Sequence, residues 1–315
     1  MDDYETVSLM SETREERANG NGRLMRQATY AAVAVAITLI AMKSVTFYLT
    51  GSVAMLGTLM DSLLDGAASL LNLVAVRHSL TPADHEHRFG HGKAEALAGL
   101  GQAIFILGSA GFIIYESISR VITPEPISNS WSGMVVIVVA IALTLALVAF
   151  QRHVITRTGS IAIAADSVHY RGDLFMNLAA LFAIFLSGVL GIHWADAVGG
   201  ALIALLIAYS AVQIALSSYN QLMDAELDDA DRERIAAIAK SHAEVVDIHD
   251  LRTRKSGTQT FIQFHLEMDG KISLSRAHMI SDDVEVRIME AFPEAEVIIH
   301  QDPAGLEDVH PIDRI

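Results

Sequence analysis

Long apolar stretches alternate with short polar segments over the first two thirds of the chain. The apolar stretches lie near residues 27–50, 53–78, 96–120, 132–151, 160–190 and 195–216. A helix needs roughly 20 residues to cross a hydrocarbon core of about 30 Å, and each stretch is about that long or longer. The fourth has no charged residue between Gly133 and Phe150. The pattern predicts a membrane bundle of six transmembrane α-helices.

The hydrophobic pattern changes after about residue 222 to that of a soluble domain. The expected elements are a helix over 228–242, strands over 245–254 and 259–268, a helix over 273–292 and a short strand over 296–301. In the second strand Ile262, Phe264, Leu266 and Met268 should point to one face, and the residues between them to the other. This α-β-β-α-β order predicts a small cytoplasmic α+β domain of ferredoxin-like kind.

Four segments are therefore expected along the chain. They are a polar cytoplasmic N-terminal segment over 1–26, a transmembrane domain over 27–217, a cytoplasmic metallochaperone-like domain over 222–303 and a flexible tail over 304–315. The first 26 residues carry four arginines, and no short apolar core with a cleavage site follows them. We therefore expect no signal peptide.

Basic residues near the helix ends predict the orientation in the membrane. The N-terminal segment and the loops over 77–93 and 151–157 are basic, whereas the alternate loops near 51, 121–131 and 191–194 carry little charge. Because cytoplasmic loops are enriched in Lys and Arg, the basic segments should face the cytoplasm. Six crossings then put both termini on the cytoplasmic side.

Composition supports a membrane protein and limits its partners. Of the 315 residues, 52% are hydrophobic, and the mean hydropathy of +0.38 is too high for an ordinary soluble domain of this size. The net charge is −15, and much of the acidity follows residue 222, which argues against nucleic-acid binding and favours a cationic partner. There is no cysteine, so disulfides and thiolate metal sites are excluded, and His, Asp and Glu remain as strong ligands.

Two pairs of ionisable residues stand inside the predicted membrane helices. Asp61 and Asp65 lie in the second helix, and His169 and Asp173 in the fifth. A charge at bilayer depth costs roughly 2.5 to 3.5 kcal/mol. The i, i+4 spacing puts both members of a pair on one helix face. Capping of a neighbouring helix or pairing with Lys43 is the structural alternative. Three carboxylates and one imidazole suit a tetrahedral Zn²⁺ site, with Cd²⁺, Fe²⁺, Co²⁺ or Mn²⁺ as competitors.

A second cluster lies in the loop string DHEHRFGHGK, where Asp84, His87 and His91 are spaced so that they could converge. Three ligands leave a fourth position for water or for His85. The alternative is a solvated polar turn with incidental histidines.

A third cluster is predicted in the soluble domain. Its members are His249, His265, His278, His300 and Asp302. Four imidazoles and a carboxylate could hold two metal ions with the carboxylate bridging them, and Gln301 is a further candidate through its carbonyl. Isolated polar histidines are the alternative. The remaining histidines, at positions 78, 153, 193, 242 and 310, have no partner pattern and are interpreted as interfacial or surface residues.

The strings SLLDGAAS, DHEHRFGHGKAE, ADSVHYRGD and VIIHQDP resemble the cation diffusion facilitator family, in particular its bacterial zinc transporters of the YiiP or FieF type. The resemblance runs from about Ala31 to Pro303. It implies a homodimer in the inner (plasma) membrane of a bacterial cell. It also implies that the first four residues form the transport site, the loop trio a second site and the cytoplasmic set a binuclear site. Lys93 and Asp224 resemble the family's interlocking salt bridge.

The function expected from residues and resemblance together is Zn²⁺ efflux coupled to protons by alternating access. The partners are then divalent metal ions, protons, the lipid bilayer and a second copy of the chain. Zn²⁺ at the cytoplasmic domain would stabilise the dimer and regulate transport. Two other classes of protein fit the sequence less well. A membrane metallohydrolase is disfavoured because there is no HExxH helix and no evident general base. A membrane-anchored metal sensor would not need ligands inside the membrane.

Overall fold

The structure is a computed structural model that describes residues 3–50, 53–122, 131–190 and 195–305. The chain divides into two compact units. One comprises residues 20–222, and the other comprises residues 1–19 together with 223–315.

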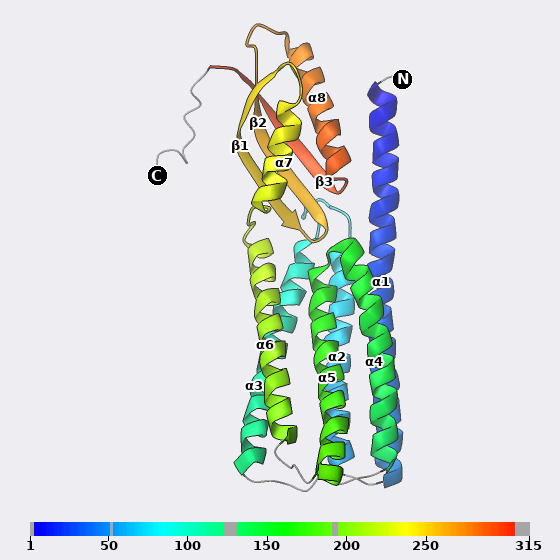
Figure 1. Cartoon of the computed structure of the whole chain (residues 1–315). Helices are drawn as coiled ribbons and strands as arrows, with labels where there is room; N and C mark the ends of the chain where they lie inside the picture. The colour runs from blue at the N-terminus through cyan, green and yellow to red at the C-terminus, as the bar shows by residue number, and fades with distance from the viewer. Residues whose placement is uncertain (1–2, 51–52, 123–130, 191–194, 306–315) are drawn as a thin grey trace. The chain divides into compact units, whose positions relative to one another are not determined.

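The predicted apolar stretches all form helices, which lie side by side in Figure 1. The helices are α1 (Asp3–Thr50), α2 (Val53–Ser79), α3 (Lys93–Ile122), α4 (Trp131–Thr158), α5 (Ile161–Leu190) and α6 (Ala195–Leu222). α3, α4 and α6 extend beyond their apolar stretches, to Lys93, Thr158 and Leu222 respectively. A helix satisfies its backbone hydrogen bonds internally, so it can continue past the apolar boundary where polar side chains meet water.

Five segments of these helices are long and apolar enough to cross a membrane, among the described residues. They are Asn19–Leu49, Thr58–Ser79, Lys93–Ser119, Val135–Thr158 and Val198–Leu222. The helix α5 is as long as its neighbours, but its first half carries Asp166, Arg171 and Asp173. The chain is therefore a multi-pass membrane protein, and α5 is the helix that bears the predicted ligands His169 and Asp173.

Small residues allow the helices of this unit to approach closely. A Cβ on Gly99 of α3 would lie 2.7 Å from both Ile161 Cγ2 and Ser218 Oγ. A Cβ on Gly66 of α2 would lie 3.0 Å from Ile40 Cδ1. Membrane helices associate through such close backbone packing, because lipid tails are as apolar as the side chains they replace. Gly66, the residue after Asp65, therefore allows α2 to pack closely against α1.

The cytoplasmic part forms the predicted α+β domain. Its elements are α7 (Asp229–Lys240), β1 (Val245–Ser256), β2 (Gln259–Met268), α8 (Leu274–Ala291) and β3 (Ala295–Pro303). The three strands form one sheet in the order β1-β2-β3. β1 and β2 are antiparallel, and β2 and β3 are parallel. The predicted element order is confirmed, with boundaries shifted by a few residues.

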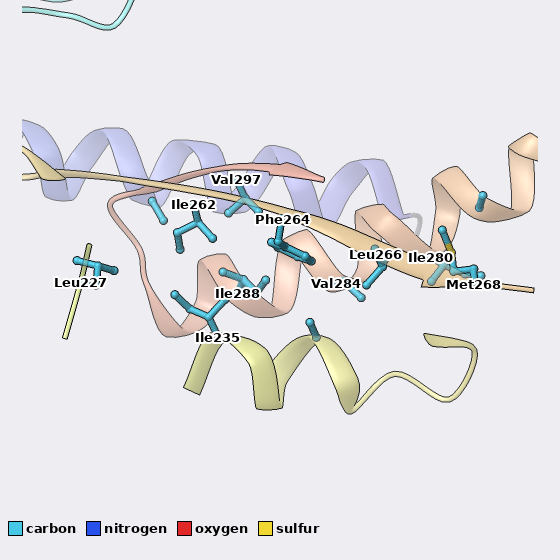
Figure 2. Packing of buried hydrophobic residues seen from close by; sticks show 13 residues of the cluster. Leu227, Ile235, Ile262, Phe264, Leu266, Met268, Ile280, Val284, Ile288 and Val297 are labelled. Atoms are coloured by element: carbon cyan, nitrogen blue, oxygen red, sulfur yellow. The ribbon is translucent and has the colours of Figure 1, made fainter. Parts of the chain in front are cut away.

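The core of this domain lies between the sheet and the helices α7 and α8 (Figure 2). Ile262, Phe264, Leu266 and Met268 are at most 2% exposed, as the alternation in β2 predicts. They pack with Ile235 of α7 and with Ile280, Val284 and Ile288 of α8. Full burial of such a side chain contributes about 1.5 to 3 kcal/mol. Because the helices cover this face of the sheet, the polar residues that alternate with these four lie on the opposite face.

Surface ion pairs connect the ends of the elements in this domain. Lys240 Nζ lies 2.6 Å from Asp247 Oδ1, and this contact lowers the pKa of Asp247. Arg276 of α8 pairs with Glu244 and lowers the pKa of that carboxyl in the same way. Both carboxylates are exposed, so we expect the pairs to orient the elements more than to stabilise them.

Candidate metal centres

The helices α2 and α5 bring three of the four predicted intramembrane residues together. Asp65, His169 and Asp173 each offer one ligand atom, and these atoms lie within 4.8 Å of one another. His169 Nε2 is 3.1 Å from Asp65 Oδ1 and 3.8 Å from Asp173 Oδ2. The His169 side chain is 8% exposed. Two carboxylate oxygens and an imidazole nitrogen thus converge on one point inside the helical bundle.

Asp61 lies one turn before Asp65 on α2 and is exposed, outside this set of three atoms. Lys43 of α1 reaches the same region of α2, where its Nζ donates to the Thr58 carbonyl at 3.0 Å and to Ser62 Oγ at 2.6 Å. The charges of Asp61, Asp65 and Lys43 interact. Because Asp61 and Asp65 repel each other, a cation between them would be needed to draw both toward one centre. The role of Asp61 as a ligand stays a prediction.

Two further buried residues of α5 support this site, and the sequence reasoning missed both. Asp166 is 1% exposed and accepts a hydrogen bond of 2.7 Å from Gln151 Nε2 of α4. The Tyr170 hydroxyl donates to the Ala32 carbonyl at 3.2 Å and lies 2.8 Å from Ser69 Oγ. These bonds tie α5 to α4, α1 and α2 on either side of His169. The spacing of Asp166 before His169 and Asp173, i, i+3 and i+7, was the available signal.

The loop trio also converges as predicted. Asp84, His87 and His91 offer ligand atoms within 4.8 Å of one another. His87 Nδ1 lies 3.4 Å from Asp84 Oδ1, and His91 Nε2 lies 3.5 Å from Asp84 Oδ2. Gly90, at φ 75°, adopts the left-handed conformation that turns the chain between the two histidines. His85 is exposed and is not part of this group.

Backbone hydrogen bonds hold the loop ligands in place without a metal. Asp84 Oδ1 accepts from the backbone N–H groups of His87, at 2.6 Å, and Glu86, at 2.9 Å. The bond from His87 is the main cause that lowers the pKa of Asp84. His91 Nδ1 lies 3.3 Å from the Thr81 carbonyl, which can only accept. The proton therefore belongs on Nδ1, and the lone pair on Nε2 faces Asp84.

The sheet register builds the third cluster. His249 of β1 lies opposite His265 of β2, and His265 lies opposite His300 of β3. Asp302, two residues after His300, shares its face. The ligand atoms of His249, His265 and Asp302 lie within 4.8 Å of one another. The cluster therefore occupies the sheet face opposite the apolar core, as the alternation in β2 implies.

Asp302 is the shared carboxylate of this cluster. Its Oδ2 lies 2.6 Å from His265 Nδ1 and 3.5 Å from His249 Nε2, while its Oδ1 lies 3.1 Å from His300 Nε2. The other nitrogen of His249, Nδ1, is 3.0 Å from Glu267 Oε1. Since a carboxylate accepts, Glu267 favours the proton on Nδ1 and leaves Nε2 toward Asp302. Each oxygen of Asp302 therefore has at least one imidazole nitrogen beside it.

Two residues that the sequence proposed for the third cluster do not join its ligand atoms within one chain. His278 is on α8, where its exposed ring pairs with Asp282 at 3.4 Å. Gln301 Nε2 donates to Ser281 Oγ of α8 at 3.0 Å, so its side chain points to the helix-covered face of the sheet. Gln301 alternates with His300 and Asp302 along β3, which explains why it faces away from them.

The predicted salt-bridge residues and three of the remaining histidines either do not join the ligand atoms of the three clusters or lie outside the described residues. Asp224 pairs with Arg254 at 3.3 Å, and Lys93 Nζ donates to the Leu222 carbonyl at 3.3 Å. Because the two residues belong to different units, their mutual salt bridge stays a prediction. His242 Nε2 lies 3.4 Å from Asp283 Oδ2, a contact between the end of α7 and α8. His193 and His310 lie outside the described residues.

Comparison with known proteins identifies the class to which these features belong. The model described as the cation efflux transmembrane domain matches residues 29–223, and the model described as the cation efflux protein, cytoplasmic domain, matches residues 227–304. The helical unit with its carboxylate and imidazole cluster, followed by the small α+β domain, is that of a cation efflux transporter and not of an enzyme. The chain belongs to the cation diffusion facilitator, or cation efflux, family.

Two relatives described as cation-efflux pumps match this chain over nearly their whole length. The chain is 47% identical over 283 residues to the cation-efflux pump FieF of Shewanella oneidensis, covering 90% of this chain and 95% of that protein. It is also 47% identical over 285 residues to the cation-efflux pump FieF of Klebsiella pneumoniae, with the same coverage. Among solved structures, the metal-bound C-terminal domain of the CzcD transporter from Thermotoga maritima covers 26% of this chain at 27% identity and a TM-score of 0.25.

Proposed function

We propose that this transporter is a homodimeric Zn²⁺/H⁺ antiporter of the bacterial inner membrane that exports metal from the cytoplasm by alternating access. The observation that carries the proposal is the convergence of Asp65, His169 and Asp173 within the helical bundle. Ionisable residues are expensive there, and a cation path is the usual reason for them. With Asp61 from the preceding turn, the substrate ion would meet three carboxylates and one imidazole.

Proton coupling follows from the chemistry of these ligands. A carboxylate or an imidazole nitrogen binds metal only in its deprotonated form, so protons and metal compete for the same atoms. Imidazole in general titrates near pH 6.5, within the range of physiological pH differences across a membrane. Metal would bind from the cytoplasm to the deprotonated site. Protons from the far side would then displace it once the helices have exposed the site there.

Zn²⁺ is the metal that the oxygen and nitrogen ligands favour on geometry. A set of Asp, Asp, His and Asp matches the small tetrahedral sites that Zn²⁺ accepts. Cd²⁺, Fe²⁺, Co²⁺ and Mn²⁺ compete for the same ligand types, because affinity order alone does not select among them. Selectivity is therefore part of the proposal and part of its test.

The cytoplasmic cluster is proposed as a binuclear regulatory site. Asp302 would bridge two ions, with His249 and His265 on one and His300 on the other. His278 lies on α8, beside Asp282 and away from these residues of its own chain. In the proposed dimer, His278 of one subunit would therefore bind an ion held by the cluster of the other subunit. Metal that binds between subunits stabilises the dimer by mass action.

The test is metal flux into proteoliposomes across a panel of divalent ions with an imposed pH gradient. Asp65→Ala should abolish zinc flux because it removes an oxygen from the shared centre. Asp269→Ala, which changes an exposed carboxylate that is not one of the predicted ligands, should transport like the parent. Zinc flux in Asp65→Ala equal to that of the parent would overturn the site. Parent flux that does not respond to the pH gradient would overturn proton coupling.

A further inference from the structure

His78, which had no partner pattern in the sequence, lies beside the loop cluster. It stands in the last turn of α2, and the centroid of its ring is 4.6 Å from that of His91, with the two ring planes at 63°. The His91 ring also lies 4.5 Å from that of His87. The rings of His78, from the end of α2, and of His87, from the loop, therefore both contact the ring of His91.

Among the described residues, three ligand side chains converge in the loop cluster. Asp84, His87 and His91 supply one oxygen and two nitrogens, whereas structural Zn²⁺ sites are almost always four-coordinate. His85 is adjacent to Asp84 in sequence, yet none of the ring contacts or ion pairs described for the loop involves it. His78 is the imidazole that the fold, and not the local sequence, delivers to the same ring cluster.

Hydrogen bonds already orient the side chains of Asp84 and His91, so the position that a fourth ligand would occupy is defined. Two backbone N–H groups hold Asp84 Oδ1, and its Oδ2 lies 3.5 Å from His91 Nε2. The Thr81 carbonyl orients the His91 ring. The side chain of His78 is exposed at a helix end, where rotation about its two side-chain torsions is not blocked by a packed core.

We propose that His78 is the fourth protein ligand of the loop metal site, together with Asp84, His87 and His91. The inference rests on the loop site being a metal site, which is part of the proposed function. The ligand set becomes three imidazoles and one carboxylate, which is a closed site of the structural kind. A metal ion there would clamp the end of α2 to the start of α3 across the loop that joins them.

The test separates the loop site from the other two clusters. The background is full-length protein in detergent that carries Asp65→Ala and His265→Ala, so that bound Co²⁺ reports the loop. Co²⁺ is titrated against a competing chelator, and the visible absorption of the ion reports its coordination. His78→Phe keeps an aromatic ring against His91 and removes the nitrogen ligand, and His85→Phe is the matched control. Asp84→Ala marks the loss of the whole site.

His78→Phe is expected to raise the Kd for Co²⁺ at least tenfold and to change its absorption spectrum, while His85→Phe leaves both unchanged. If Asp84→Ala weakens binding but His78→Phe retains the affinity and the spectrum of the background, His78 is not a ligand. If Asp84→Ala also has no effect, the loop is not a metal site and both ideas fail. Circular dichroism checks folding, and His78→Gln, which lacks the ring, provides a second variant with the same expectation. None of these outcomes tests the proposed zinc transport through the site that contains Asp65, which is examined separately by the flux experiment.

Discussion

At the scale of single residues, the ligand atoms of each cluster are oriented by neighbours that are not ligands. The Thr81 carbonyl and the Glu267 carboxylate each face one nitrogen of a histidine, which leaves the other nitrogen toward a carboxylate. Backbone N–H groups hold Asp84 ionised, as its lowered pKa indicates. Such outer contacts fix the tautomer and the ring orientation before an ion arrives. They are therefore as informative about function as the ligands.

Asp166 provides a prediction at this scale. Asp166→Asn keeps the size of the side chain next to Gln151 but replaces a buried carboxyl group three residues before His169. We expect the affinity of the intramembrane site for Co²⁺ to fall by about tenfold, the lower end of effects seen for outer contacts of metal sites. The measurement is a Co²⁺ titration of protein whose other clusters carry Asp84→Ala and His265→Ala. Asp269→Asn is the control, and equal affinity in the two variants would contradict the prediction.

At the scale of elements, α5 carries the intramembrane site, and its neighbours fix where it lies. Glu95 of α3, which is 1% exposed, accepts the backbone N–H of Ala162 at 3.4 Å in the first turn of α5. This contact satisfies one of the donors that a helix leaves open at its start. Gly99, one turn further along α3, brings the two helices into close contact. The position of His169 thus depends on packing contacts two to three turns away from it.

Gly99→Ala should separate these helices. The added Cβ would lie 2.7 Å from Ile161 Cγ2 and from Ser218 Oγ, so α3, α5 and α6 must shift apart. Overpacking of this kind costs about 1 to 3 kcal/mol. Gly101→Ala is the matched control, because nothing lies within 4 Å of its added Cβ and alanine favours a helix over glycine. Thermal unfolding in detergent, followed by circular dichroism, should give Gly99→Ala the lower Tm. A Tm equal to or above that of Gly101→Ala would show that the contact yields without cost.

At the scale of the whole molecule, groups of side chains that could hold a metal ion occur in both units of the chain. Because binding free energies are linked, a metal that stabilises one arrangement of the dimer can bias the other unit. His265→Ala removes a nitrogen 2.6 Å from Asp302 Oδ2. We expect this change to raise the zinc concentration needed for half-maximal dimer formation at least tenfold. Size-exclusion chromatography with light scattering would measure it. His153→Ala, on an exposed residue of α4, is the control. An unchanged zinc dependence of both dimer formation and transport after replacing His265 and Asp302 would argue against a regulatory site.

Much of this architecture could be predicted because the relevant signals are local. Segments of about 20 apolar residues can satisfy their backbone in a membrane only as helices, and the period-2 pattern of β2 assigns one face to the core. The same reasoning anticipated the members of each cluster, since i, i+4 spacing and strand alternation operate within a single element. It missed Asp166, whose spacing before His169 was an available signal, and His78, whose ring contacts that of His91 from the end of another helix.

Periodicity, composition and the ionisable residues within apolar runs were thus enough to predict the membrane helices, a three-stranded α+β domain and the candidate metal ligands, because each depends on residues close together in the chain. Which ligand atoms meet depended on packing between elements. The fold brings Asp65 to His169 across two helices, leaves Asp61 and His278 outside the atoms that converge within one chain, and sets His78 against His91. Those distances come from helix contacts and strand register, which no local pattern encodes.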